Sequence, residues 1–293
     1  MRIDEIKKIL LFDGDCLTHY TSLSVAEMLI FNNSLFRLSE GSFLNDTSEG
    51  KELFKYLDYE LIEMKRNETS AELYSRKPFI GSFVSENKND DLTLWRMYGK
   101  EKNEEAKGCA LTLQLDKLKE KLDDVFVLDT KLNDKVRIEE FKFYRVAYRD
   151  VEITGDFKVP GLSSASLKKL NKRMSELLTL VNKFKENKKN DQDDKHNLNE
   201  LLNEVAFLFK SNEYQYENEL RLVIKGAGFD KKISNKFSPP RVFIELVSIK
   251  ELISKITLGP KVDRSDEWAT AFYYSQEKLE LYPEIFISKL PFK

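Results

Sequence analysis

The sequence predicts a fold of the α+β class, with a mainly antiparallel sheet as its core and flanking helices. Short apolar or alternating segments, typical of strands, recur along the chain between polar or glycine-containing breaks. Segments whose apolar residues lie three and four positions apart, typical of amphipathic helices, are grouped between these strands. With 41% hydrophobic and 12% aromatic residues, the chain can build a sizeable core.

Helices are predicted where a capping residue precedes apolar residues with helical spacing. A short helix opens the chain, and Thr21 or Ser22 can cap the second one. Residues 46–49 have capping-box spacing, which predicts a helix from there to about residue 64. This cap explains the acidic residues of the segment better than a cation site does. Further helices are expected over residues 90–98 and 265–278.

The segment 164–210 contains two amphipathic helices joined by a polar, charged tract at 188–195. We expect an antiparallel helical hairpin, inserted into a single domain that spans residues 1–293. Strands are predicted over residues 35–39, 79–85, 109–113, 125–128, 141–153, 220–225, 242–247, 256–258 and 285–288.

The composition excludes several classes of function. The 48 basic and 50 acidic residues nearly balance, so no global field would steer a polyanion, and no basic run with interleaved aromatic residues stands out. Cys16 and Cys109 cannot form a disulfide framework and lack the spacing of metal ligands. The N-terminus does not resemble a signal peptide, and no stretch approaches the roughly 20 apolar residues of a membrane span. We expect a cytoplasmic protein with no membrane partner and no metal.

A first polar cluster, His19-Tyr20-Thr21-Ser22, lies where a strand is expected to end and a helix to begin. A histidine on an alternating strand is more often hydrogen-bonded scaffolding than a catalytic group. The crowded hydroxyl groups beside it and the amide donors of the following helix favour a ligand site instead.

A second cluster contains Ser82 and Ser85 on a strand, followed by Trp95 and Tyr98 three residues apart on a helix. The two aromatic residues share one helix face, so they pack on the sheet or form a wall for a flat ring. Packing is the favoured interpretation for Trp95.

The third cluster is Glu217-x-Glu219-x-Arg221, at the start of an apolar strand. Period-two alternation places these three residues on one strand face. They form either a solvated row of ion pairs, which contributes little to stability, or the lining of a cleft.

These clusters together resemble a bacterial family, the domain-of-unknown-function family 2971, from about residue 17 to residue 275. The motifs that carry the resemblance are His19-Tyr20-Thr21-Ser22, Leu35-Phe36-Arg37-Leu38-Ser39, Leu44-Asn45-Asp46-x-x-Glu49, Ser82-Phe83-x-Ser85-Glu86, Leu94-Trp95-x-x-Tyr98, Glu217-x-Glu219-x-Arg221 and Ile256-x-Leu258-Gly259. Thr47 and Val84 depart from the residues usual in that family.

A more distant resemblance is to the ADP-ribosyltransferase fold. It implies that His19 holds a ribose hydroxyl of NAD, with Tyr20 and Thr21 beside it. It also implies that Ser82 or Ser85, together with Tyr98, receives the nicotinamide, that Arg221 adds to the binding surface, and that Glu219 and Glu217 are catalytic. A fixed carboxylate would stabilise the oxocarbenium-like transition state of nicotinamide release.

The resemblance implies an NAD-consuming transferase or glycohydrolase, with NAD as substrate and a protein or nucleic acid as unknown acceptor. Such an enzyme would be a bacterial toxin or phage-defence effector. The alternative is a non-catalytic nucleotide-binding or sensor module, and a nuclease has less support. If the first interpretation is correct, His19 and Glu219 should line one cleft instead of lying on opposite faces of the sheet.

Overall fold

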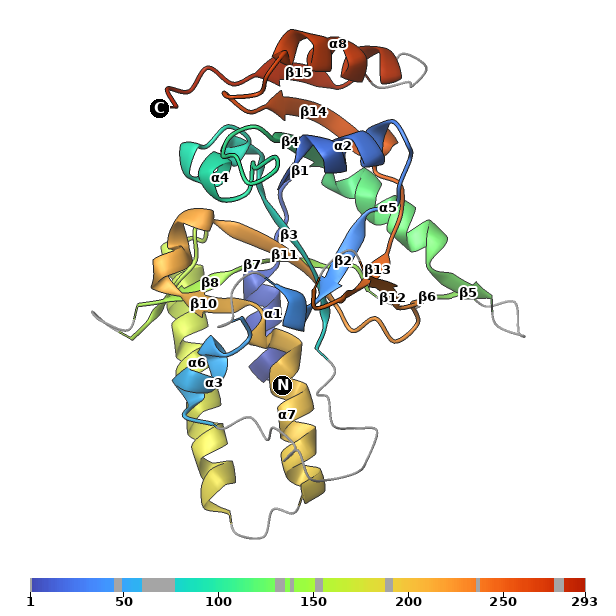
Figure 1. Ribbon diagram of the computed structural model, residues 1–293. Helices are drawn as coiled ribbons and strands as arrows, with labels where there is room; N and C mark the ends of the chain where they lie inside the picture. Colours follow the sequence, from blue (N-terminus) through green and yellow to red (C-terminus); the bar gives the residue numbers. More distant parts are fainter. Residues whose placement is uncertain are drawn as a thin grey trace.

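The structure is a computed structural model that describes residues 2–44, 49–59, 77–129, 135–137, 140–150, 155–187, 192–235, 238–276 and 282–292. A ten-stranded sheet forms its centre, with helices on either side (Figure 1). Neighbouring strands are antiparallel, except that β14 pairs with β15 and β10 with β8 in parallel. The α+β class with a mainly antiparallel sheet is therefore confirmed.

The strands of the central sheet are β1 (Cys16–Thr21), β2 (Arg37–Glu40), β3 (Phe79–Ser85), β4 (Cys109–Gln114), β7 (Phe143–Arg145), β11 (Glu219–Ile224), β12 (Lys232–Ser234), β13 (Arg241–Glu245), β14 (Ile253–Leu258) and β15 (Glu284–Ile287). A three-stranded sheet contains β8 (Ala147–Arg149), β9 (Phe157–Lys158) and β10 (Phe209–Ser211), and β5 (Val127–Asp129) pairs with β6 (Lys135–Arg137).

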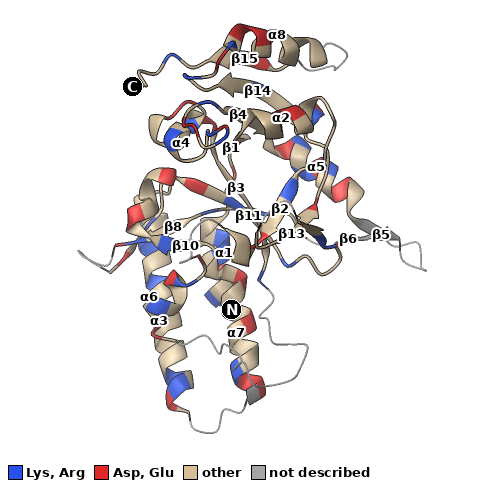
Figure 2. Cartoon of the chain, in the orientation of Figure 1, with Lys and Arg blue, Asp and Glu red and all other residues tan. Residues whose placement is uncertain are grey.

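The α-helices are α1 (Arg2–Leu10), α2 (Leu23–Ile30), α3 (Glu52–Leu57), α4 (Leu92–Met97), α5 (Leu115–Val125), α6 (Ser164–Glu186), α7 (Gln192–Ala206) and α8 (Ser265–Ser275). One 3-10 helix, η3 (Asn212–Glu217), leads into β11. Acidic and basic residues are interspersed along α5 and α6 (Figure 2), as the near-zero net charge suggests. No helix of the described ranges is long and apolar enough to cross a membrane.

The central sheet divides at β3, because two strands, β1 and β2, pair with the same edge of β3. β11 pairs with β3 along residues 79–84 on one side. On the other side, β2 pairs with Phe79 and Ile80, whereas β1 pairs with Val84 and Ser85. The middle of this edge of β3, between the two pairings, pairs with neither β1 nor β2. The sheet continues from β2 to β13 and β12, and from β1 to β4, β14 and β15.

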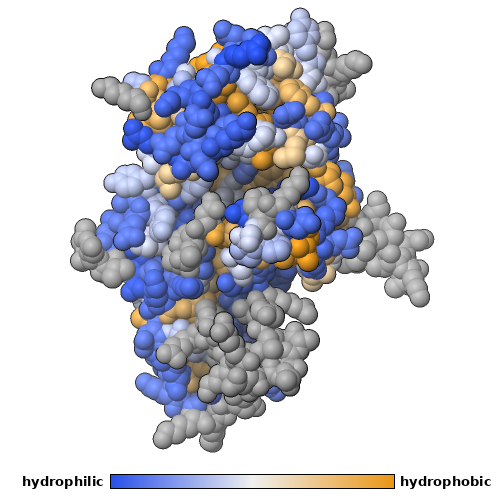
Figure 3. All heavy atoms as spheres, viewed as in Figure 1, coloured by the Kyte–Doolittle hydropathy of each residue, from blue (hydrophilic) through white to orange (hydrophobic). Residues whose placement is uncertain are grey.

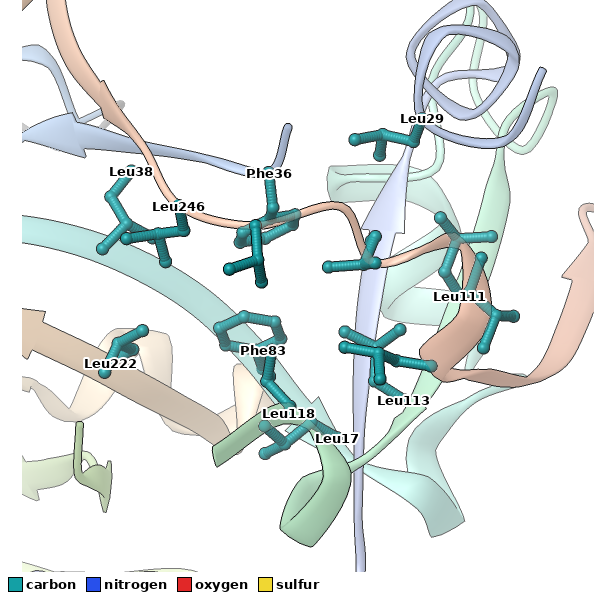
Figure 4. Close-up of a cluster of buried hydrophobic side chains, with 14 of the residues drawn as sticks. Leu17, Leu29, Phe36, Leu38, Phe83, Leu111, Leu113, Leu118, Leu222 and Leu246 are labelled. Carbon is teal, nitrogen blue, oxygen red and sulfur yellow. The ribbon is translucent and has the colours of Figure 1, made fainter. Parts of the chain in front are cut away.

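Apolar side chains cover both faces of the sheet. In the larger cluster, Leu17, Phe83, Leu113 and Leu222 come from four different strands and pack with Leu118 of α5 (Figure 4). A second cluster joins α1, α3, α6 and α7 to β10. Burying each large aliphatic or aromatic side chain contributes about 1.5–3 kcal/mol, so these two clusters hold the sheet in place. Hydrophilic residues cover most of the described surface in the view of Figure 3.

The two helices expected between residues 164 and 210 are present as α6 and α7, and α1 and α3 each contact both of them. The second helix ends earlier than predicted. α7 stops at Ala206, and Lys210 lies on β10, which pairs with β8. The assignment of a single domain with an inserted hairpin stays a prediction.

Two other expected elements differ from the structure. The strand predicted over residues 141–153 is two short strands, β7 and β8, on different sheets. The chain changes sheet at Val146, whose amide donates to the Glu219 carbonyl. The helix predicted from Asp46 to Met64 is represented by α3 alone, and residues 45–48 and 60–76 lie outside the described ranges.

Candidate functional site

A cavity of about 970 Å³ opens where the sheet divides. It is larger than the cavity of about 640 Å³ between α8 and β15, which contains none of the predicted residues. The predicted site residues that line the larger cavity are His19, Tyr20, Thr21, Ser82, Tyr98, Glu217 and Glu219. They come from β1, β3, β11, the end of α4 and the end of η3, so a split sheet brings together residues up to 200 positions apart.

Two predicted residues do not line this cavity. The Ser85 hydroxyl donates to the side chain of Asn87 at 2.5 Å, at the far end of β3. Arg221 is only 1% exposed and lies behind the cavity wall. Its donors are bound to Glu49, Glu219 and the Phe207 carbonyl, so its assignment as an NAD-binding residue stays a prediction.

His19 and Glu219 line the same cavity, as expected, but their side chains lie on opposite faces of the sheet, contrary to the other half of that expectation. Glu219, Arg221 and Ser82 share one face of paired β11 and β3. His19 follows Leu17 onto the other face, where its ring contacts Phe36 and Phe83 at centroid distances of 5.1 and 5.7 Å. The ladder between β1 and β3 ends at the pair Thr18 and Val84, so the two faces meet at the opening beyond it.

The hydrogen bond of His19 fixes its tautomer when the ring is neutral. Nδ1 lies 3.0 Å from the carbonyl oxygen of Ser82, and a carbonyl can only accept, so Nδ1 carries the proton. Burial lowers the pKa of His19, which favours the neutral ring. Nε2 is then a hydrogen-bond acceptor, suited to a hydroxyl group.

The residues around His19 are mainly structural. The Tyr20 hydroxyl donates to the Lys88 carbonyl at 2.6 Å and accepts from the Asp91 amide at 3.0 Å. The ring of Trp95 packs edge-on against Tyr20, 4.8 Å between centroids, and is fully buried. Ser22, one of the two expected caps, accepts from the amide of Val25 and begins α2. These contacts anchor α4 beside the end of β1.

Glu217 and Glu219 are not on one strand, as the alternation suggested. Glu217 is the last residue of η3, and Asn218 adopts a left-handed conformation with φ 48°. β11 begins only at Glu219. Asparagine tolerates this conformation better than most residues. The turn aims both carboxylates into the same cluster, although the strand register of Glu217 was predicted wrongly.

Five charged residues form a buried cluster behind and beside the cavity, which we call the acid cluster: Glu49, Lys210, Glu217, Glu219 and Arg221. Arg221 binds both oxygens of Glu49 at 2.7 Å and both oxygens of Glu219 at 2.8 and 2.9 Å. Lys210 Nζ lies 2.7, 3.0 and 3.1 Å from oxygens of Glu217, Glu219 and Glu49. The cluster is thus buried and is no solvated ion-pair row, and all of its members except Arg221 line the cavity.

Sequence reasoning missed Lys210 and assigned Glu49 to a helix cap. The assignment of Glu49 is wrong, since Arg221 binds its carboxylate and α3 begins after it without a side-chain cap. A bidentate pair between a guanidinium and a buried carboxylate is a stronger interaction than a helix cap at the surface. A lysine next to Phe209 in an apolar segment was the available signal for Lys210.

The two glutamates that face the cavity differ in their pKa values. Burial opposes ionisation of Glu219, yet Arg221 and Lys210 hold its pKa down at about 2. Burial raises the pKa of Glu217, and the neighbouring charge of Glu219 adds to this, while Lys210 acts in the opposite direction. The Tyr98 hydroxyl donates to Glu217 at 2.5 Å. Glu219 is therefore a fixed anion, and Glu217 is the carboxyl group better suited to exchange a proton.

The low pKa of Glu219 predicts a loss of stability in acid. Its folded value of about 2 lies below its ordinary 4.5, so its stabilisation is complete above pH 4.5 and is lost as the pH falls toward 2. We expect the free energy of unfolding of wild type to exceed that of Glu219→Gln at pH 7. At pH 3 this difference between the two proteins should be smaller by roughly 2 kcal/mol. Urea unfolding of both proteins at each pH measures this, and an unchanged difference would contradict the assignment.

Within the described ranges, no group of three or more His, Cys, Asp or Glu side chains is arranged to hold a metal ion. The cavity instead combines one neutral imidazole acceptor, hydroxyl groups, aromatic rings and a fixed anion. Such a lining suits a polar organic ligand that carries hydroxyl groups and a flat ring.

Fold and site together define a mainly antiparallel α+β protein with a polar cavity at a division of its sheet. Residues 94–222 match the model of the family described as "Protein of unknown function (DUF2971)". This confirms the family identified from the sequence motifs. The matched range includes Tyr98 and the Glu217–Arg221 motif, whereas the His19 and Ser82 motifs lie before it. No curated protein and no solved structure matches the chain, so the resemblance to ADP-ribosyltransferases stays a prediction.

Proposed function

We propose that this protein binds NAD in the cavity at the sheet division and cleaves its nicotinamide–ribose bond, as a glycohydrolase or an ADP-ribosyltransferase. The observation that carries the proposal is the shared cavity, which joins the neutral His19, Tyr98 and the two glutamates. A volume of about 970 Å³ is within the usual range of ligand pockets and sufficient for a nucleotide. Acting in the cytoplasm, such an enzyme would deplete NAD, as a toxin or phage-defence effector does.

His19 has the chemistry to recognise a sugar. Its Nε2 accepts a hydrogen bond from a ribose hydroxyl, while Nδ1–H stays bound to the Ser82 carbonyl. Because the ring packs against the stacked pair Phe36 and Phe83, its orientation is fixed before the ligand binds. Preorganisation of this kind lowers the entropy lost on binding.

The acid cluster would supply the catalytic charge. Cleavage breaks the bond between ribose C1′ and the nicotinamide nitrogen, and the bonding electrons leave with nicotinamide. The ribose then carries oxocarbenium character, which nearby negative charge stabilises more strongly than it stabilises the ground state. With three carboxylates against two cations, the cluster has a net negative charge when all its members are ionised. In this proposal, water or an acceptor group then bonds to C1′, and Glu217 takes the released proton.

Incubating the purified protein with NAD and measuring free nicotinamide by chromatography tests the proposal. We expect nicotinamide to accumulate with wild type and to fall at least about tenfold with His19→Ala, mainly through a higher KM, because the ribose contact is lost. His196→Ala is the matched control, since this second histidine lies on α7 and does not line the cavity. Equal rates for wild type and His19→Ala would overturn the assigned role of His19.

One observation favours a second candidate, a non-catalytic nucleotide-binding or sensor module. Both oxygens of Glu219 are already bound by Arg221, and one also contacts Lys210. A carboxylate saturated in this way can serve structure alone. This candidate predicts that NAD binds, that no nicotinamide is released with or without candidate acceptor proteins, and that Glu219→Gln changes stability only.

A further inference from the structure

The smaller, three-stranded sheet places two polar side chains next to each other beside the acid cluster. β10 pairs in parallel with β8, and Lys210 stands directly opposite Tyr148 in their register. Residues paired in this way point to the same face of a sheet. Tyr148 is fully buried, and Lys210 is 5% exposed. Because Lys210 binds three carboxylates of the acid cluster, the same sheet face presents Tyr148 to the cluster as well.

The Tyr148 hydroxyl binds the backbone of Glu219, whose amide donates to it at 2.9 Å. The ladder between β11 and β7 ends at the pair Leu220 and Arg145. The chain then leaves for the smaller sheet at Val146, whose amide donates to the Glu219 carbonyl at 3.0 Å. The hydroxyl thus takes the place of the backbone carbonyl that a continued ladder would offer to the Glu219 amide.

Glu219 is therefore held at two places, its backbone and its carboxylate. Tyr148 and Val146 hold the backbone. Arg221 binds the two carboxylate oxygens at 2.8 and 2.9 Å, and Lys210 binds one of them at 3.0 Å. Hydrogen bonds weaken steeply when their distance or angle departs from the optimum, so a shift of the backbone would weaken the contacts of the carboxylate.

Tyr148 does not line the cavity at the sheet division, whereas Glu219 does. The hydroxyl therefore acts on a ligand in that cavity only through Glu219. Burial, and then the negative charge of Glu219, raise the pKa of Tyr148, so the hydroxyl stays neutral and adds no charge of its own beside the carboxylate.

We propose that Tyr148 is a positioning residue of this site. Its hydroxyl, presented by the smaller sheet, fixes the backbone of Glu219 and so keeps the carboxylate at the cavity wall, where Arg221 and Lys210 bind it. This inference rests on the proposed function for its effect on nicotinamide release, whereas the link between the hydroxyl and the carboxylate is measurable without a ligand.

A double-mutant cycle of Tyr148→Phe and Glu219→Gln measures that link by urea unfolding at pH 7. Tyr148→Phe removes the hydroxyl and keeps the ring, and Glu219→Gln leaves the backbone amide in place. A hydroxyl that served the backbone alone would contribute equally in both backgrounds. We expect Tyr148→Phe to lower the urea midpoint of wild type, and to lower that of Glu219→Gln by at most about half as much, because no charged carboxylate is then left to position.

Tyr144→Phe is the matched control. Tyr144 is a buried tyrosine of β7, 5% exposed, and packs in the apolar cluster that joins α1, α3, α6 and α7 to β10. Its substitution should change the urea midpoint equally in wild type and in Glu219→Gln. Circular dichroism verifies that each variant is folded.

Steady-state kinetics of nicotinamide release measures the consequence for the reaction. The kcat of Tyr148→Phe should fall at least about tenfold, since a misplacement on the order of 1 Å costs up to about a hundredfold. KM should stay within about twofold, because Tyr148 is not part of the cavity lining. A lost ligand contact would raise KM instead. Tyr144→Phe should keep both constants.

The outcomes separate the role of Tyr148 from the proposed function. Equal losses of stability in the two backgrounds, or a kcat of Tyr148→Phe within about twofold of wild type, would overturn the role of Tyr148. If wild type releases nicotinamide but the cycle shows no link, the proposed function stands and Tyr148 is structural. If the link is present but wild type releases no nicotinamide, Tyr148 still positions the carboxylate and the proposed cleavage fails.

Discussion

Replacing Glu219 with glutamine is expected to lower the rate of nicotinamide release about a hundredfold or more, while the affinity for NAD changes far less. The substitution keeps the shape of the side chain and removes the charge that Arg221 and Lys210 hold in place. An interaction made mainly in the transition state appears in kcat, whereas one made equally in the ground state appears in KM. Removing one preorganised electrostatic contact from an active site commonly has an effect of this size.

The variant should fold, although it should be less stable. Glutamine at 219 leaves two carboxylates, Glu49 and Glu217, against two cations, so no net charge is stranded. One amide N–H₂ group must face Arg221 or Lys210, which costs about 1–3 kcal/mol. Single-turnover kinetics at saturating NAD, with circular dichroism as the check of folding, separates the two effects. A wild-type rate in Glu219→Gln would show that Glu219 is structural.

Glu217→Gln should behave differently. Water attacks an oxocarbenium-like carbon without much help, so NAD hydrolysis should fall less than in Glu219→Gln. Transfer to an acceptor group that must lose a proton should fall more, since Glu217 is the carboxyl with the raised pKa. The ratio of transfer to hydrolysis, measured with radiolabelled NAD, therefore assigns separate roles to the two glutamates.

The elements defined by local sequence were predicted well. The pattern of Leu220, Leu222 and Ile224 identified the apolar face of β11, and all three lie in the larger apolar cluster. Ser22, an expected capping residue, and Asp91, in the helix expected over residues 90–98, accept backbone hydrogen bonds at the starts of α2 and α4. Such features depend on residues a few positions apart, and local periodicity and capping report them directly.

The acid cluster could be predicted only in part, because its partners are distant in the sequence. Glu49 and Arg221 are 172 positions apart, and neither shows in its own neighbourhood that it will be buried beside the other. Glu49 satisfied a local capping pattern, but its carboxylate binds Arg221. Lys210 was assigned to the end of a helix, although pairing of β10 with β8 turns it toward the cluster. The division of the sheet at β3 likewise follows from long-range pairing.

Replacing Arg221 with methionine is expected to destabilise the protein by about 3–5 kcal/mol, the usual cost of leaving buried charges without their partner. Glu49 and Glu219 each lose two contacts at once, and the Phe207 carbonyl loses a donor. Arg37→Met is the matched control. Arg37 is half exposed and pairs with Glu245, so its loss should cost at most about 1 kcal/mol. Urea unfolding at pH 7 measures both values.

The pH dependence of the destabilisation in Arg221→Met identifies its cause. Without Arg221, burial raises the pKa of Glu219, whose remaining cationic contact is the shared Lys210, so the penalty is present at high pH and is relieved as Glu219 takes up a proton. The deficit relative to wild type should therefore narrow below about pH 5. Adding Glu49→Gln and Glu219→Gln to Arg221→Met should recover part of the stability at pH 7 as well, because neutral groups cost less to bury. A deficit equal to that of Arg37→Met, or one independent of pH, would show that Arg221 does not hold the acid cluster together.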